Sequence, residues 1–403
     1  MRISSGFIAN KAIAVYTGPS GIALIGAFSN FISIVLTFAN GAISTGVVKY
    51  TAEYEGQDEK LKSLFSTSFR ISLYCSGFVG FLLLLFGAYF SNWIFKTSIY
   101  TNPINILGVT IVLYSLNSLI ISIINGKNEI KVYSIINTVG SIIGLGLTLV
   151  LVYFFKVKGA LYSLVISQSI VFFVSMIVIT RMNWFSIVNF KQKINFEILK
   201  KLSHYSLMAI VTALTVPVSQ IMLRNMLIST NGLQSAGIWQ GIMRISDGYL
   251  MILTTALATY YLPKLSSLHT DKELRTEIFN GYKLVLPTII VSSFLIYLMR
   301  FIIIKILYTP DFSQMSELFF FQLLGDFFKM ASWLLAYLML AKSMTKLFII
   351  TEIGSTLLYL ILGFVCVDFF GVKGISIAFA INYFVYLLVM IYIFRSLIFG
   401  KGI

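Results

Sequence analysis

Long apolar runs separated by short polar segments dominate the hydrophobic pattern of this chain. A helix needs roughly 20 apolar residues to cross the hydrocarbon core of a bilayer. Twelve runs approach or exceed that length, and they span residues 1–17, 21–48, 64–90, 104–125, 131–154, 159–180, 205–228, 236–262, 283–307, 316–341, 346–367 and 374–395. We therefore predict an all-α polytopic membrane protein with about twelve transmembrane helices.

Composition supports this prediction. Hydrophobic residues make up 58% of the 403 residues and charged residues only 11%, whereas a soluble domain carries about 25% charged residues to keep its surface wetted. The formal net charge of +15 is typical of nucleic-acid-binding proteins. Here, however, the cations lie between apolar blocks, so we expect a lipid bilayer as the partner and no nucleic acid.

The distribution of Lys and Arg predicts the orientation, because cytoplasmic loops of membrane proteins are enriched in these residues. With both termini placed in the cytoplasm, twenty of the cations fall on the cytoplasmic side and five on the opposite side. The other five lie inside predicted helices or at their margins: Lys11, Arg224, Arg244, Arg300 and Lys329.

Several landmarks recur at a nearly constant offset along the chain. FFKVKG at 154–159 returns as FFGVKG at 369–374, and DEKLK at 58–62 returns as DKELR at 271–275. These matches predict a duplicated six-helix unit, although Val-Lys-Gly is also a common helix start. Six helices are an even number, so the repeats are parallel, an arrangement that places a substrate cavity between two lobes.

The repeat predicts the domain organisation. Residues 1–180 form one six-helix lobe and 204–403 the other, around a central cavity. A basic cytoplasmic linker, 181–203, carries aromatic residues suited to lie on anionic headgroups. The seventh predicted helix begins near residue 205, and its counterpart in the first repeat would begin upstream of Met1. We therefore expect a truncated first helix and favour a start codon further upstream.

Charges at bilayer depth are the candidate functional residues, because burying one costs at least about 2.5–3.5 kcal/mol. Arg224 has no acidic residue within helical reach, and Lys11 lies near the equivalent place in the first repeat. We interpret both as ligands of an anionic group, above all a phosphate, which Arg can bind bidentately. The alternative is snorkelling to the membrane interface.

Two further pairs lie at i, i+3 spacing, Arg244 with Asp247 and Asp326 with Lys329. Each pair can share a helix face and partly neutralise itself, so a purely structural role is an alternative for both. Glu352 lacks an evident partner on its own helix. A lone buried carboxylate can bind and release a proton during transport, or it can pair with a cation on a neighbouring helix.

We find no motif for catalysis or metal binding. Cys75 and Cys366 lie within apolar runs, and His204 and His269 are far from either cysteine. A P-loop for ATP hydrolysis is also missing from the sequence. We therefore expect neither a cofactor nor a metal, and we predict a transporter rather than an enzyme.

Several stretches resemble a known family. They are TVPVSQIMLRNML at 215–227, GIWQGIMRISDGYL at 237–250, YLPKLS at 261–266, QLLGDFFKM at 322–330 and Thr351-Glu352, with YTGPSGIALIGAF at 16–28 and GVVKYTAEY at 46–54 in the first half. The chain resembles the Wzx-type flippases of the enterobacterial common antigen and O-antigen pathways, within the multidrug/oligosaccharidyl-lipid/polysaccharide exporter superfamily.

This resemblance implies twelve helices in two lobes and a cargo of undecaprenyl-pyrophosphate-linked oligosaccharide. The cargo would cross from the cytoplasmic to the periplasmic leaflet of the bacterial inner membrane. Polymerase and chain-length proteins of the same pathway would be potential partners. Similar proteins carry charged residues at the positions of Arg224, Asp247, Asp326, Lys329 and Glu352. The match at Arg244 is less secure.

We combine these features into one hypothesis. Arg224 and Lys11, supported by Arg244 and Lys329, hold the pyrophosphate, and Glu352, Asp326 or Asp247 takes up the driving proton. A multidrug exporter of the same fold is the first alternative, but its cationic drugs favour an acidic cavity. A membrane-embedded polymerase or ligase is the second, but no predicted outer loop exceeds roughly a dozen residues, too short for a catalytic loop.

Overall fold

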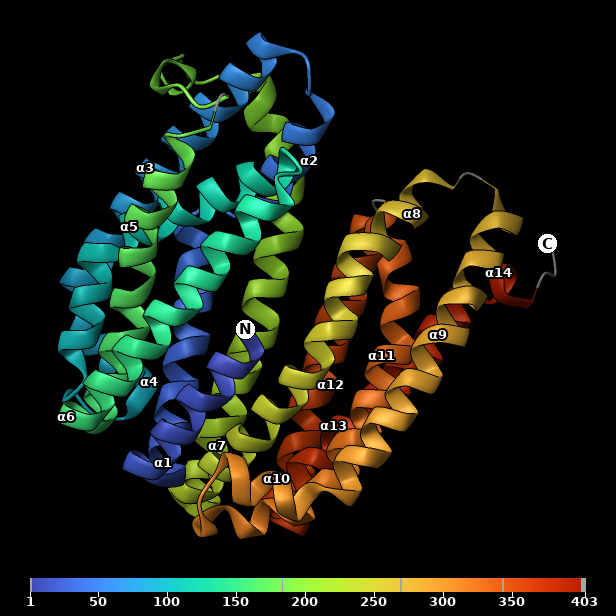
Figure 1. The fold of residues 1–403 in the computed structure, drawn as a ribbon. Helices are drawn as coiled ribbons and strands as arrows, with labels where there is room; N and C mark the ends of the chain where they lie inside the picture. Colours follow the sequence, from blue (N-terminus) through green and yellow to red (C-terminus); the bar gives the residue numbers. More distant parts are fainter. Residues whose placement is uncertain (1, 183, 269, 343, 400–403) are drawn as a thin grey trace. The chain divides into compact units, whose positions relative to one another are not determined.

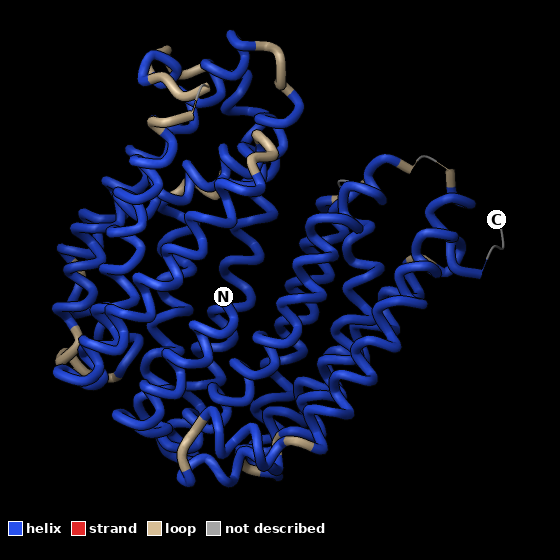
Figure 2. The backbone as a smooth tube through the Cα atoms, in the orientation of Figure 1, coloured by secondary structure: helices blue, strands red, loops and turns tan. Residues whose placement is uncertain are grey.

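The computed structural model describes residues 2–182, 184–268, 270–342 and 344–399, and throughout these ranges the chain is almost entirely helical (Figures 1 and 2). The first half contains α1 (Arg2–Ala39), α2 (Ser44–Glu53), α3 (Asp58–Leu85), α4 (Gly87–Phe95), α5 (Thr101–Gly126), α6 (Ile130–Ile179), the 3₁₀ helix η1 (Ile187–Phe190) and α7 (Phe196–Ala256).

The second half continues directly from α7. It contains the π-helix η2 (Leu257–Tyr261), α8 (Leu262–Ser267), α9 (Asp271–Leu298), α10 (Arg300–Leu307), the 3₁₀ helix η3 (Pro310–Glu317), α11 (Phe319–Ala341), α12 (Thr345–Phe370), α13 (Val372–Ile393) and α14 (Arg395–Phe399). No strand occurs in the described ranges, which confirms the all-α prediction.

Among the described residues, nine helices are long and apolar enough to cross a membrane. Three of them contain a residue with non-helical backbone angles: Gly18 in α1, Lys156 in α6 and Gly232 in α7. Each of these residues lies in or beside a predicted connection between two spans. When the two parts of each interrupted helix are counted separately, the nine helices supply the twelve predicted spans.

Two predicted loops are helical in the structure. Residues 58–62 and 271–275 form the first turns of α3 and α9, with acidic residues at the start of each helix. Asp and Glu are favourable there because the helix N-terminus carries a partial positive charge. α9 begins with a capping box in which Thr270 and Glu273 each accept a backbone N–H of the other. The apolar pattern missed these turns because they are polar.

Contacts group the chain into two compact units: residues 1–17 with 24–218, and residues 18–23 with 219–403. In the first unit α3, α2, α4 and α6 pack on α5, and in the second α11 and α12 pack on α13 while α9 packs on α11. The division thus falls within α7, directly after Val218, and within α1, where residues 18–23 belong to the second unit. The predicted lobes, 1–180 and 204–403, describe the sequence repeat and stay a prediction.

The segment predicted as a linker is attached to α3 within the first unit. Ser66 Oγ donates to the carbonyl of Asn189 (3.0 Å) and accepts from the amide of Gln192 (3.0 Å), while Arg70 Nε donates to the carbonyl of Gln192 (3.1 Å). The ring of Phe190 stacks on that of Phe65 with centroids 5.8 Å apart. From Phe196 onward the predicted linker is already part of α7.

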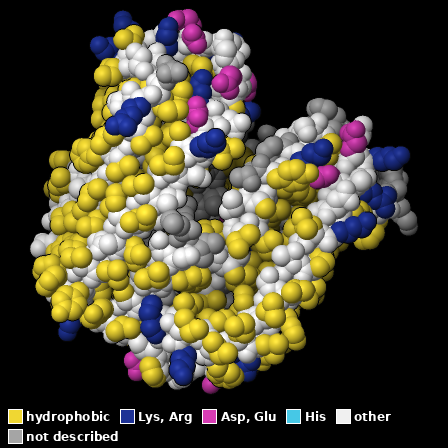
Figure 3. All heavy atoms as spheres, in the orientation of Figure 1, with side chains coloured by type: hydrophobic (Ala, Val, Ile, Leu, Met, Phe, Trp, Pro, Cys, Tyr) yellow, Lys and Arg dark blue, Asp and Glu magenta, His cyan; other side chains and the backbone are white. Residues whose placement is uncertain are grey.

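Hydrogen bonding within the helices suits a lipid environment. Ser and Thr hydroxyls donate to the carbonyl four residues earlier, as Thr17 does to Ile13 (2.7 Å) and Thr148 to Gly144 (2.7 Å). These bonds satisfy polar groups that lipid cannot. On the face shown in Figure 3, hydrophobic side chains cover the flanks of the helices and Lys and Arg gather at their ends. The chain is therefore a multi-pass membrane protein.

A close backbone approach within the second unit requires glycine at position 237. A Cβ atom built there would lie 1.8 Å from the carbonyl oxygen of Pro19 and 2.3 Å from its carbonyl carbon. The neighbouring atoms belong to backbone, so they cannot rotate away as a side chain would. Gly237 thus allows residues 18–23 to pack directly against α7.

We predict that G237A destabilises the protein by about 1–3 kcal/mol, because the backbone segments must separate to accept the methyl group. Thermal unfolding of the purified protein in detergent will measure the loss. G146A is the matched control, since a Cβ at Gly146 meets no atom within 4 Å. Equal unfolding temperatures for both variants would contradict the packing described here.

Candidate functional site

Arg224 lies in the part of α7 that precedes the break at Gly232, and its side chain is buried, with a relative exposure of 1%. Its Nη2 donates to Oε1 of Gln240, which follows the break. The guanidinium carbon also lies 5.6 Å from the ring centroid of Trp239, a cation–π contact. The break therefore folds α7 back so that Gln240 and Trp239 can contact Arg224.

Burial leaves the Arg224 guanidinium incompletely satisfied. Its Nε and Nη1 have no hydrogen-bond partner among the described residues. Its one described side-chain hydrogen bond goes to a neutral amide, so no carboxylate neutralises it at contact distance. Since Arg stays protonated in proteins, this is a positive charge inside the second unit with two donor nitrogens available. Its side chain is buried within the protein, which argues against the snorkelling alternative for Arg224.

Asp326 of α11 is fully buried, and hydroxyl groups from α7 hold it. Ser246 Oγ lies 2.6 Å from both carboxylate oxygens, and the hydroxyl of Tyr249 donates to Oδ2 at 2.8 Å. The amide of Gln322 lies 3.5 Å from Oδ1. These donors lie on two helices, so the carboxylate links α11 to α7 by hydrogen bonds.

Lys329 does not form a direct ion pair with Asp326, although the two residues share a helix at i, i+3 spacing. The ion pairs within 4 Å among the described residues join other side chains. Instead, Lys329 Nζ lies 4.9 Å from the ring centroid of Trp333 and 5.8 Å from that of Tyr383. The two charges attract each other over a longer distance. Aromatic rings thus provide the close contacts of this cation.

The remaining candidates join the same electrostatic cluster. Asp247 interacts with both Lys329 and Arg244, and Arg244 repels Arg224. Glu352 of α12 interacts with Tyr383 of α13, a residue that Asp326 and Asp247 also influence. The second unit therefore brings together six charged residues from α7, α11 and α12: Arg224, Arg244, Asp247, Asp326, Lys329 and Glu352.

Lys11 belongs to the first unit, in the part of α1 before Gly18. Its predicted partnership with Arg224 stays a prediction. The structure adds Gln240, Tyr249, Trp333 and Tyr383, which the sequence did not single out. Gln240 and Tyr249 lie within the stretch 237–250, the most specific part of the family resemblance, so that stretch carried a signal for both.

Within the described residues, no group of three or more His, Cys, Asp and Glu side chains could hold a metal ion. Cys75 and Cys366 are free thiols. His269 lies outside the described residues, as does the side chain of His204. What the described site offers is charge at membrane depth: cations that can hold an anion and carboxylates that can exchange a cation or proton.

Comparison with solved structures defines the class of fold. The chain superimposes on an inward-facing multidrug resistance MATE family transporter of the MOP superfamily with a TM-score of 0.84, 15% identity, and coverage of 99% of this chain and 95% of that one. A MOP superfamily transporter from Pyrococcus furiosus gives a TM-score of 0.75 at 15% identity, covering 100% and 96% of the two chains. The chain has the fold of a MOP superfamily transporter.

Sequence comparison then shows the family. The profile of the polysaccharide biosynthesis protein family matches residues 25–317. This chain belongs to that family. The lipid III flippases of Escherichia coli (strain K12) and Shigella flexneri are each 28% identical to it over 391 residues, covering 96% of this chain and 93% of theirs. The resemblance to these flippases, predicted from the sequence, is confirmed.

We predict that Y249F lowers stability by about 1–3 kcal/mol, because it removes a hydrogen bond to a buried carboxylate. The unfolding midpoint in detergent will report the change. Tyr74, 61% exposed on α3, supplies the control Y74F, which should be neutral. If Y249F unfolds at the wild-type temperature, its hydroxyl is not holding Asp326.

Proposed function

We propose that this protein is a flippase, not an enzyme, that moves an undecaprenyl-pyrophosphate-linked oligosaccharide from the cytoplasmic to the periplasmic leaflet of the bacterial inner membrane. The observation that carries the proposal is Arg224. It is a buried cation with two unsatisfied donor nitrogens and no carboxylate against it, in a chain related to lipid III flippases. A pyrophosphate supplies the missing negative charge and the acceptor oxygens.

Arg224 is the primary pyrophosphate ligand in this proposal. Its free Nε and Nη1 can each donate a charge-assisted hydrogen bond to a phosphate oxygen. Arg244 repels Arg224, and an anion bound nearby relieves that repulsion. Lys329 adds a further positive charge, and Lys11 of the first unit is the proposed fourth ligand.

The carboxylates of the second unit are the proposed coupling sites. Asp326, Asp247 and Glu352 all act electrostatically on Tyr383, so a proton or cation taken up at one of them changes the field at the others. Lys329 contacts the same tyrosine ring. Charge uptake there can therefore alter how strongly Lys329 holds an anion, which links the driving cation to the cargo during alternating access.

We infer the orientation from the cation count, twenty against five, which supports cytoplasmic positions for both termini. Oligosaccharide lipids delivered to the outer leaflet are substrates for polymerisation. Polymerase and chain-length proteins of the same pathway are therefore the proposed partners. This orientation also places the polar first turns of α3 and α9 on the cytoplasmic side.

A multidrug exporter is the second candidate, favoured by the fold likeness to multidrug resistance MATE transporters. Its cargo is cationic, so it needs negative charge that its own cations do not neutralise. In the second unit, hydroxyl groups donate hydrogen bonds to Asp326. Arg224, by contrast, has two donor nitrogens without a hydrogen-bond partner. That polarity supports an anionic cargo.

We predict that R224A lowers the flipping rate roughly 10- to 100-fold, since it removes charge-assisted hydrogen bonds to pyrophosphate. A deletion strain carrying the variant should accumulate its lipid-linked oligosaccharide on the cytoplasmic side. Mass spectrometry of extracted lipids and surface polysaccharide will measure the effect. The same extract from the deletion strain identifies the cargo.

Two controls separate transport from folding. R224K keeps a charge and should retain part of the activity, whereas R181A, which alters an exposed cation, should be fully active. Membrane levels are compared by immunoblot. If R224A is present in the membrane at the wild-type level and surface polysaccharide is normal, Arg224 has no role in transport. If deletion of the gene abolishes drug resistance and no lipid-linked oligosaccharide accumulates, the result favours the multidrug exporter.

We also predict that E352Q abolishes the acceleration of flipping by an inwardly directed proton gradient, because the amide cannot take up a proton. The flipping rate of a fluorescent lipid-linked oligosaccharide will be measured in proteoliposomes with and without a pH step. E53Q changes an exposed carboxylate and should respond as wild type does. If D247N, D326N and E352Q all keep the full pH response, the coupling assignment fails.

A further inference from the structure

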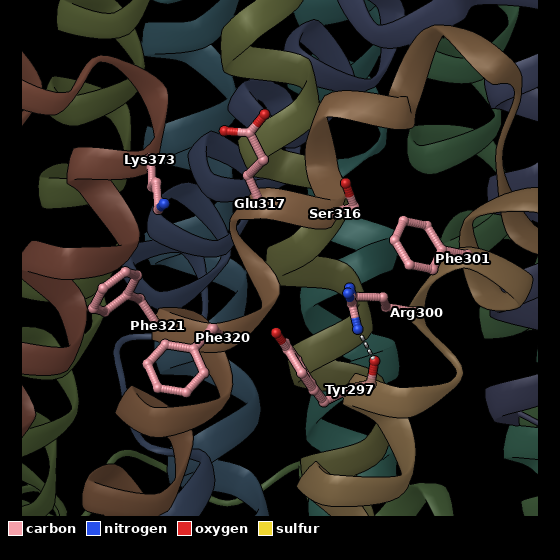
Figure 4. Close-up of a pocket in the computed structure, with 8 residues that line it drawn as sticks. All are labelled: Tyr297, Arg300, Phe301, Ser316, Glu317, Phe320, Phe321 and Lys373. Carbon is pink, nitrogen blue, oxygen red and sulfur yellow. Dashed lines mark hydrogen bonds between the residues drawn. The ribbon is translucent and has the colours of Figure 1, made fainter.

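A second cluster of cations lies away from Arg224, in a cleft of about 430 Å³ at one end of the second unit (Figure 4). We call it the terminal cleft. Its lining comes from the end of α9, the start of α10, η3, and the first turns of α11 and α13: Tyr297, Arg300, Phe301, Ser316, Glu317, Phe320, Phe321 and Lys373. A volume of this size accommodates a phosphate with an attached sugar or glycerol.

Arg300 is held in place by its neighbours but keeps donors available. Its guanidinium carbon lies 4.2 Å from the ring centroid of Tyr297 and 4.4 Å from that of Phe301, and Nη1 donates to the carbonyl of Tyr297 (2.8 Å). A guanidinium has five N–H donors, and the described contacts use one. Stacking therefore orients the group without neutralising it.

Lys373 is the second cation of the terminal cleft. Its Nζ lies 5.8 Å from the ring centroid of Phe321, and the ion pairs among the described residues include neither Lys373 nor Arg300. Figure 4 shows Lys373 and Arg300 on opposite sides of the opening, with Tyr297 and Phe320 below it. An anion between them would interact with both.

The backbone adds to this positive field. Phe320 and Phe321 belong to the first turn of α11, and Lys373 to the first turn of α13, both helices of more than twenty residues. Helix N-termini carry partial positive charge and free N–H groups. Two helix N-termini, an Arg and a Lys thus line one cleft, and the single carboxylate there, Glu317, is exposed.

The surroundings indicate what kind of anion fits. Large apolar side chains beside the cleft are exposed, including Phe301 (60%), Leu298 (57%) and Phe320 (54%). Residues of a membrane span with such exposure face acyl chains. The cations therefore adjoin an exposed apolar surface, as a site for a lipid phosphate requires. By the charge-based orientation this is the periplasmic side.

We propose that the terminal cleft binds the phosphate-bearing headgroup of a lipid in the outer leaflet, with phosphate between Arg300 and Lys373 and the lipid chain on the apolar rim. The aromatic rings cover the adjoining sugar or glycerol. This site is separate from Arg224 and does not require transport, so its test stands independently of the flippase proposal.

The test uses native mass spectrometry of the purified full-length protein with phosphatidylglycerol, undecaprenyl phosphate and diacylglycerol as probes. The double variant R300Q/K373Q should weaken binding of a phosphate-bearing lipid about tenfold, as expected for lost charge-assisted hydrogen bonds. E317Q should strengthen it, because the competing carboxylate is gone. Diacylglycerol, which lacks phosphate, should bind weakly to all forms.

The repeat supplies the matched control. Lys158 occupies the position equivalent to Lys373, 215 residues earlier, whereas the position equivalent to Arg300, at the offset of 213 between residues 58–62 and 271–275, is Gly87. K158Q should leave lipid binding unchanged. An effect on undecaprenyl phosphate alone identifies a site for the carrier lipid, and an effect on phosphatidylglycerol alone a site for bulk phospholipid; either supports the proposal.

Two results would overturn it. One is wild-type lipid binding by R300Q/K373Q when size-exclusion chromatography shows the variant to be folded. The other is binding of inorganic phosphate as tight as that of the lipids, which would show that the apolar rim contributes nothing.

Discussion

The backbone of a membrane-spanning chain must satisfy its own N–H and C=O groups, because lipid offers no hydrogen-bond partner. This constraint determines most of the architecture. Over its described ranges the chain is helical and lacks strands, and even the connections at Gly18, Lys156 and Gly232 interrupt a helix by one residue rather than by an open loop. Hydroxyl side chains donate to carbonyls one turn back for the same reason.

The same scarcity of solvent gives each buried charge a large effect. Asp326 receives hydrogen bonds from Ser246 and Tyr249 and is thereby satisfied within the protein. Arg224 donates to a neutral amide and lies against an aromatic face. Neither partner carries a negative charge, so the charge of Arg224 is uncompensated at contact distance. The buried anion thus has hydrogen-bond donors around it, whereas the buried cation lacks an anionic partner at contact distance. This asymmetry is the basis of our proposal that the cargo is anionic.

The spans themselves could be predicted, since apolar runs of sufficient length leave few alternatives. Their polar ends could not: α3 and α9 begin within segments expected to be loops, because acidic first turns carry no apolar signal. The charged residues of the site were also found from sequence, as intramembrane charges are rare. Their partners were not. Gln240 reaches Arg224 only because Gly232 reverses the chain between them, and Ser246 meets Asp326 through packing of α7 on α11. Such contacts depend on tertiary structure.

The two halves of the chain bend a helix at corresponding places of the predicted repeat, but by different means. After Ala39 the first half breaks the helix, with Gly41 and Ala42 both at positive φ, whereas about 215 residues later the second half widens into the π-helix Leu257–Tyr261. A break with left-handed residues is anchored to those residues. A π turn keeps backbone hydrogen bonds, now from residue i to i+5, and such turns are frequent at functional sites. The two corresponding positions of the predicted repeat thus differ in backbone geometry: left-handed residues fix the bend in the first half, whereas the second half keeps a hydrogen-bonded, widened turn.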